Sequence, residues 1–118
     1  MIRFIHCVKA LPEIAAADFR RYLHSAEFTD LMDQLARLSQ ASKHKLSLTL
    51  QIEANLDLMR ERGGAEPFDA VIELWWNSGQ ELTQMTQMAA FRDLLQQIED
   101  YQRKFVDFSR SSRFFAEG

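Results

Sequence analysis

Phe-Asp-Ala-Val-Ile-Glu-Leu-Trp-Trp-Asn-Ser, residues 68–78, is the most strongly strand-like run in this sequence. Its β-branched and large apolar side chains suit a pleated, packed surface. Alternation places Val71 and Trp75 on one face of the expected strand. Ile72 and Trp76 fall on the opposite face. Because both faces are apolar, we expect a central strand covered on both sides, by helices below and by a second copy of the chain above.

The length of 118 residues is near the commonest domain size, so we expect one domain spanning residues 1–118. The only cysteine, Cys7, cannot form an intrachain disulfide, which fits a reducing, cytoplasmic location. Fourteen basic against seventeen acidic residues give a net charge of −3, which argues against nucleic-acid binding. No apolar run approaches the roughly 20 residues that span a bilayer, so we expect no membrane association.

The period of the apolar residues predicts alternating strands and helices around the central strand. Further strands are expected at residues 2–9, 44–52 and 112–116, and helical segments at residues 15–39, 55–62 and 78–101. The first helical segment either runs through to residue 39 or breaks near Ser25, which would then cap a second helix. Ser78, three residues before Glu81, predicts a capping box at the start of the last segment, which bends near residues 88–90.

This order, β-α-β-β-α-β, predicts the α+β class and the ferredoxin-like split β-α-β arrangement, an antiparallel sheet with its helices on one face. The other face is left bare and apolar, which marks an association site. A two-fold homodimer, paired sheet face to sheet face, covers it most economically and produces a dimeric α+β barrel. Glu73 interrupts this face, and we interpret it as the ion-pair partner of Arg3 or Arg113 on a neighbouring strand.

Several stretches match a known family pattern over nearly the whole chain: Met-Ile-Arg-Phe-Ile at residues 1–5, Asp-Phe-Arg-Arg-Tyr at 18–22, the run at 68–76, Phe-Val-Asp at 105–107, Ser-Arg-Ser at 109–111 and Phe-Phe at 114–115. On these residues the chain resembles the EthD-like family of the dimeric α+β barrel group. The resemblance implies the fold expected above. It also implies similarity to small dehydratases and cyclases that act on polyketides, to quinol-forming monooxygenases and to haem-degrading proteins.

Two positions depart from the family pattern. Many relatives follow the histidine near the end of the first helical stretch with Gly-Pro or Ala-Pro, whereas His24 is followed here by Ser25. Where some relatives use a histidine early in the second helical region, this chain has Gln87 and Met88. The second departure argues against a pair of catalytic histidines and against a haem-ligating histidine.

His6 is the first candidate for catalysis, because an imidazole can give or take a proton near neutral pH. Tyr22 and His24, on the helix that faces the first strand, are its candidate partners. The alternative is that His6 is a hydrogen-bonded core or interface residue. The histidines lack the tight spacing of metal ligands, and no glycine-rich phosphate loop follows a strand, so we expect neither a metal nor another cofactor.

The expected ligand pocket lies between the sheet and the helices and takes a small apolar or aromatic molecule. Its candidate walls are Phe4, Phe19, Trp75, Trp76 and Met85. Because Trp75 and Trp76 fall on opposite faces, we expect one beneath the helices and the other toward the dimer core or the pocket. Ordinary core and interface packing is the alternative for each of these side chains.

Three hypotheses for the function remain open, because one fold hosts many activities. The first is a cofactor-independent dehydratase or cyclase that uses His6 for acid–base chemistry. The second is a non-catalytic ligand-binding or accessory protein with the same cavity. The third is a haem-handling protein or quinol monooxygenase, against which the missing second histidine counts. The sequence leaves open whether the protein is an enzyme.

Overall fold

Four strands form one antiparallel sheet in the order β2-β3-β1-β4, with β3 and β1 in the centre. The computed structural model describes all of residues 1–118. Its elements are β1 (Ile2–Val8), α1 (Ala16–Leu23), α2 (Ala26–Leu38), β2 (Lys43–Leu48), α3 (Glu53–Glu61), β3 (Ala70–Trp76), α4 (Gly79–Met85), α5 (Ala89–Gln102), the 3-10 turn η1 (Phe108–Arg110) and β4 (Ser112–Glu117). This is the α+β, ferredoxin-like arrangement that the sequence predicts.

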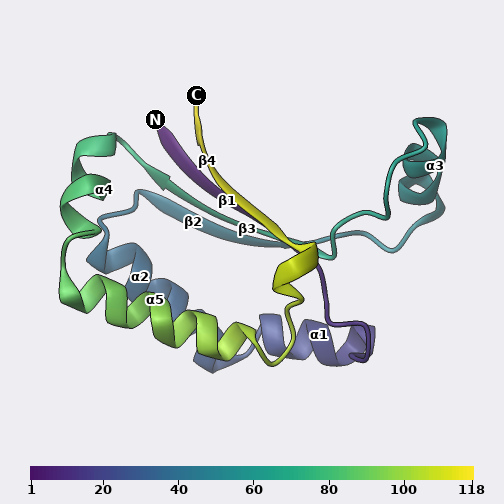
Figure 1. The fold of residues 1–118 in the computed structure, drawn as a ribbon, viewed down its shortest axis with the longest axis horizontal. Coiled ribbons are helices and arrows are strands. Elements are labelled where there is room, and N and C mark those ends of the chain that lie inside the picture. Colours follow the sequence, from purple (N-terminus) through teal and green to yellow (C-terminus); the bar gives the residue numbers. More distant parts are fainter.

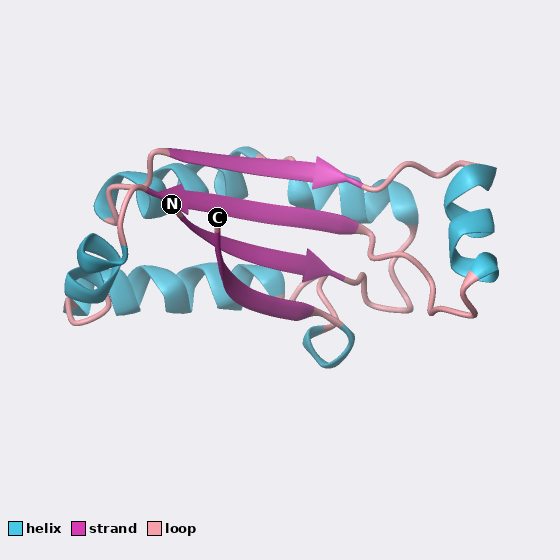
Figure 2. Cartoon of the chain, turned by 90° about the horizontal axis from the view of Figure 1, so that it is seen from above, coloured by secondary structure: helices cyan, strands magenta, loops and turns pink.

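The sheet and the helices form two layers, with α1, α2 and α5 on one face of the sheet and the other face open (Figure 1). The view onto the open face shows the four strands side by side with these helices behind them (Figure 2). Helix α3 stands apart beyond the end of the sheet in both views, and none of its residues is buried. None of the helices is both long enough and apolar enough to span a membrane.

The register between β1 and β3 decides which side chains face the helices. His6 lies opposite Ile72 on the helix-facing side, and both are buried. Trp76 is buried on the same side, whereas Trp75 lies on the open face and is only half-buried. The prediction that the two tryptophans occupy opposite faces is therefore confirmed, and Trp76 is the one beneath the helices.

The first helical segment breaks at Ser25, which is one of the two alternatives predicted. Helix α1 ends at Leu23, and the Ser25 hydroxyl accepts a hydrogen bond of 3.1 Å from the backbone N–H of Phe28. The hydroxyl groups of Ser25 and Tyr101 lie 2.5 Å apart, which ties the junction of α1 and α2 to α5. Tyr101 also stacks on Phe28, with ring centroids 5.4 Å apart.

Three local predictions are wrong. Ser78 precedes α4, but its side chain makes no capping hydrogen bond. Strand β2 ends at Leu48 rather than residue 52, because the chain then leaves the sheet toward α3. Glu73 makes no ion pair with Arg3 or Arg113: its cross-strand neighbours are Ile5 and Lys45, and Arg113 lies on the helix-facing side, opposite His6.

The open sheet face is mixed rather than wholly apolar. Ile5 and Val71 contribute apolar surface near its centre. Trp75 is flanked by Arg3 on β1 and by Lys43 on β2, and the Lys43 ammonium lies 5.0 Å from the centroid of the Trp75 ring. The expected bare apolar face is therefore present at the centre of the sheet, whereas the β2 side is cationic.

Candidate functional site

An apolar hollow, here termed the apolar cavity, lies between the helix-facing side of the sheet and helices α2, α4 and α5. Its volume of about 410 Å³ is within the range of small-ligand sites. Nine of its eleven lining residues are hydrophobic, so it suits a ligand with an apolar body. The lining residues are Phe4, Leu35, Leu74, Trp76, Leu82, Thr86, Phe91, Leu95, Arg113, Phe114 and Phe115.

Three aromatic side chains form one wall of the apolar cavity. The centroid of the Phe115 ring lies 5.4 Å from that of Phe4 and 6.3 Å from that of Trp76. Trp76 is held in place, because its indole N–H donates to the carbonyl and hydroxyl oxygens of Ser39, each at 3.1 Å. Phe114 and Phe115 are 49% and 57% exposed, so the cavity reaches solvent beside the edge strand β4.

A smaller polar hollow, here termed the His6 recess, adjoins the apolar cavity. It has a volume of about 160 Å³ and is lined by His6, Glu99, Phe108, Ser111, Ser112 and Arg113. Arg113 lies directly opposite His6 in the register of β1 and β4, and it lines both hollows. The His6 ring also lies 6.2 Å from the ring of Phe4, which lines the apolar cavity. Arg113 is therefore the residue that the two hollows share.

The environment of His6 favours the neutral imidazole. Burial, with a smaller contribution from the positive charge of Arg113, lowers the pKa of His6 from 6.5 to about 4. The ring nitrogens make no hydrogen bond with the protein, and neither is fully sealed from solvent. A neutral imidazole has one donor and one acceptor, so both remain available to a ligand in the recess.

The structure does not bring Tyr22 and His24 to His6. His24 is exposed and directly follows the last residue of α1. Tyr22 stacks on Phe105, with ring centroids 5.4 Å apart, and lines a separate, largely polar hollow of about 490 Å³ between α1 and α5. The sequence predicts this trio because both residues lie on the helix after β1, but no residue of α1 lines the His6 recess, and Tyr22 packs toward Phe105 and Tyr101 instead.

Two of the five expected pocket walls, Phe4 and Trp76, line the apolar cavity. Trp75 lies on the other face of the sheet. Phe19 packs on Phe105 in the core, with ring centroids 5.5 Å apart, and Met85 packs against the core without lining the cavity.

The residue that the sequence analysis missed as part of the site is Arg113. The sequence suggests Arg113 only as a partner for Glu73, which lies on the opposite face of the sheet. A charged residue directly before Phe114 and Phe115 on an expected edge strand is the one signal that could have drawn attention to it.

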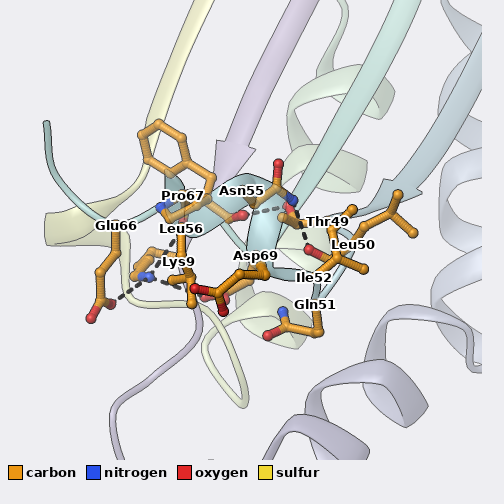
Figure 3. Close-up of a pocket in the computed structure, with 12 residues that line it drawn as sticks. Lys9, Thr49, Leu50, Gln51, Ile52, Asn55, Leu56, Glu66, Pro67 and Asp69 are labelled. Atoms are coloured by element: carbon orange, nitrogen blue, oxygen red, sulfur yellow. Dashed lines mark hydrogen bonds and ion pairs between the residues drawn. The ribbon is translucent and has the colours of Figure 1, made fainter. Parts of the chain in front are cut away.

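Another hollow, of about 370 Å³, lies where the connections of α3 meet the end of β1 (Figure 3). The Lys9 ammonium donates to the Pro67 carbonyl at 3.1 Å and to the Glu66 carboxylate at 3.3 Å, and it lies 3.8 Å from the Asp69 carboxylate. Asp69 also accepts a hydrogen bond of 2.7 Å from the backbone N–H of Ala10. Because these groups satisfy one another, we interpret this hollow as the joint between α3 and the body of the domain.

Solved structures with the same fold include three that cover almost the whole chain. A dimeric protein of unknown function with a ferredoxin-like fold, from Bacteroides fragilis, has a TM-score of 0.63 and 8% identity, over 99% of this chain and 95% of that one. An EthD family protein from Bacillus halodurans has a TM-score of 0.62 and 14% identity, over 100% and 98%. A variant of SnoaB, a cofactor-independent oxygenase from Streptomyces nogalater, has a TM-score of 0.58 and 12% identity, over 99% and 91%.

At these identities the likeness shows the fold alone. It supports, at the level of the fold, the resemblance to the EthD-like family that the sequence suggests. No family model matches the sequence, and no curated protein sequence is significantly similar to it.

The lowered pKa of His6 predicts a specific loss of stability in acid. The unfolded chain takes up the His6 proton near pH 6.5, whereas the folded chain does so only near pH 4. The free energy of unfolding should therefore fall by about 3 kcal/mol between pH 6.5 and pH 4 through this group alone. The free energy of unfolding, measured with urea across this pH range, should fall with decreasing pH more steeply for the wild type than for His6→Asn. An NMR titration midpoint for the His6 ring near 6.5 would contradict it.

Proposed function

We propose that the protein binds a small apolar or aromatic molecule in the apolar cavity. The observation that carries the proposal is the cavity itself, about 410 Å³ in volume and lined almost entirely by hydrophobic side chains. The opening beside β4 provides a path from solvent. The shared fold with SnoaB, a cofactor-independent oxygenase, is compatible with small-molecule chemistry on this scaffold.

A second candidate function, acid–base catalysis by His6, is favoured by its neutral imidazole and by ring nitrogens that no protein group engages. In such a reaction the imidazole accepts a proton from an acidic C–H beside a carbonyl group; the C–H electron pair forms a C=C bond and the carbonyl π pair moves to the oxygen, which gives an enolate. Return of the proton from the imidazolium to another atom completes an isomerisation. In a ligand with a β-hydroxyl group, the hydroxyl instead leaves as water with that proton; in a ligand with a second carbonyl group, the enolate carbon attacks that carbonyl carbon to close a ring and its oxygen takes the proton. A non-catalytic binding protein is the alternative, in which His6 only hydrogen-bonds the ligand.

The haem-handling hypothesis has less support. Haem iron is usually held by a histidine, cysteine, methionine or tyrosine side chain. None of these residue types lines the apolar cavity.

We also propose that two chains associate through the open sheet face. The face has an apolar centre that no element of the chain covers (Figure 2). Glu73 has no ion pair within the chain, while Lys43 and Lys45 on the same face are exposed, so charges of both signs are available to a second copy. The similar protein from Bacteroides fragilis is described as dimeric.

Binding in the apolar cavity should be reported by one tryptophan and not by the other. The chain labelled with 5-fluorotryptophan gives one ¹⁹F resonance for each of Trp75 and Trp76, and Trp75→Phe assigns them. Titration with the aromatic ketone 2-tetralone should shift the Trp76 resonance, with a dissociation constant below about 1 mM, because Trp76 lines the cavity. The Trp75 resonance serves as the control and should stay in place. No shift of Trp76 at saturating solubility would contradict the proposed site.

Catalysis by His6 should appear as exchange of the acidic α-hydrogens of 2-tetralone for deuterium in D₂O, followed by NMR. We expect the wild type to exceed His6→Asn by about 100-fold, while His6→Asn still binds the ketone. His44→Asn is the matched control, because His44 pairs with Asp33 away from both hollows. Exchange should be lost as the pH falls through about 4 and His6 becomes protonated. Binding without accelerated exchange would favour the non-catalytic alternative.

Association through the open face should be sensitive to a charge at Ile5. In Ile5→Arg the new guanidinium lies opposite Glu73, so the single chain can accommodate it. In a dimer it would add a charge to the apolar centre of the interface and weaken association by about 100-fold. Sedimentation velocity should therefore show two chains for the wild type and for the exposed control Gln97→Arg, and one chain for Ile5→Arg. A two-chain Ile5→Arg protein would place the interface elsewhere.

A further inference from the structure

Arg113 is the only charged residue that lines the apolar cavity. Thr86 is the one other polar residue there. Arg113 also lines the His6 recess, so its side chain stands where the apolar and polar hollows meet. A ligand that fills the cavity therefore meets a single positive charge, on the side of the His6 recess.

No group of the protein neutralises this charge. Arg113 makes no ion pair, and its neighbour across the sheet, His6, is neutral at physiological pH. Glu99 is the one carboxylate in the recess, and it is engaged by Arg103 at 3.4 Å instead. The positive charge of Arg113 is thus left free for a ligand.

From this arrangement we infer that the ligand is an aromatic carboxylate, with its ring system in the apolar cavity and its carboxylate on the Arg113 guanidinium. The inference rests on the proposed function, because it specifies the ligand of the same site. A planar guanidinium presents two parallel N–H donors that match a carboxylate, so orientation as well as charge is recognised. The carboxylate end is directed toward the His6 recess, because Arg113 borders both hollows.

The competing explanation is that Arg113 only prevents other chains from pairing with the edge of the sheet at β4. Strand β4 is an edge strand, and charged side chains on edge strands discourage pairing with other chains. That role needs a charge at the edge but no ligand, so the two explanations differ in what removal of the guanidinium does to binding.

A matched pair of probes separates the explanations: 2-naphthoate, which is an anion, and 2-naphthamide, which has nearly the same shape without the charge. Calorimetric titration of the wild type should show naphthoate binding about tenfold more tightly than the amide. Arg113→Met retains much of the apolar stem and should remove that preference by weakening naphthoate alone. Arg92→Met, which removes the same charge from the exposed face of α5, should retain the preference for naphthoate.

The outcomes distinguish this inference from the proposed function. If both probes bound the wild type equally tightly and shifted the Trp76 resonance, the inference that the ligand is a carboxylate would be overturned. The cavity would still be a binding site. If Arg113→Met and Arg92→Met weakened the binding of naphthoate equally, the cause would be the net charge of the protein. That result would also overturn the inference. Failure of both probes to bind the folded wild type would overturn the proposed function itself.

Discussion

The antiparallel register between β1 and β3 is the constraint on which the rest of this structure depends. It places His6 opposite Ile72 beneath the helices and Ile5 opposite Glu73 on the open face. A slip of one residue would exchange the two faces of a strand and turn its core side chains toward solvent. The same pairing that buries the core thus also separates the side of the sheet that holds the apolar cavity from the open face.

The site itself depends on a second pairing, between β1 and the last strand. Strand β4 brings Arg113 to His6 and Phe115 to Phe4, across more than a hundred residues of sequence. Because β4 is an edge strand, these side chains contact β1 on one side and remain exposed on the other. A central strand could contribute the same residues, but it could not provide an entrance.

The sequence predicts the strands well because period-two alternation is a local property, and the faces of Trp75 and Trp76 follow directly from it. It also indicates the break at Ser25, since a capping serine leaves a local signal. It does not predict that Arg113 faces His6, because the register between strands far apart in sequence depends on packing of the whole sheet. The partners proposed for His6 on α1 fail to reach it for the same reason: where a helix sits over a sheet is a tertiary property.

The segment that contains α3, between the end of β2 at Leu48 and the start of β3 at Ala70, is joined to the rest of the domain by a few polar contacts around Lys9 and Asp69. None of the residues of α3 is buried. Its backbone hydrogen bonds are therefore supported by little packing, and such segments open at a far lower free energy than the core. Changes in the length or sequence of α3 and its connections would not alter the β1–β3 register or the lining of the apolar cavity. In evolutionary terms it is the part of the molecule most free to acquire new contacts, while the sheet stays constrained.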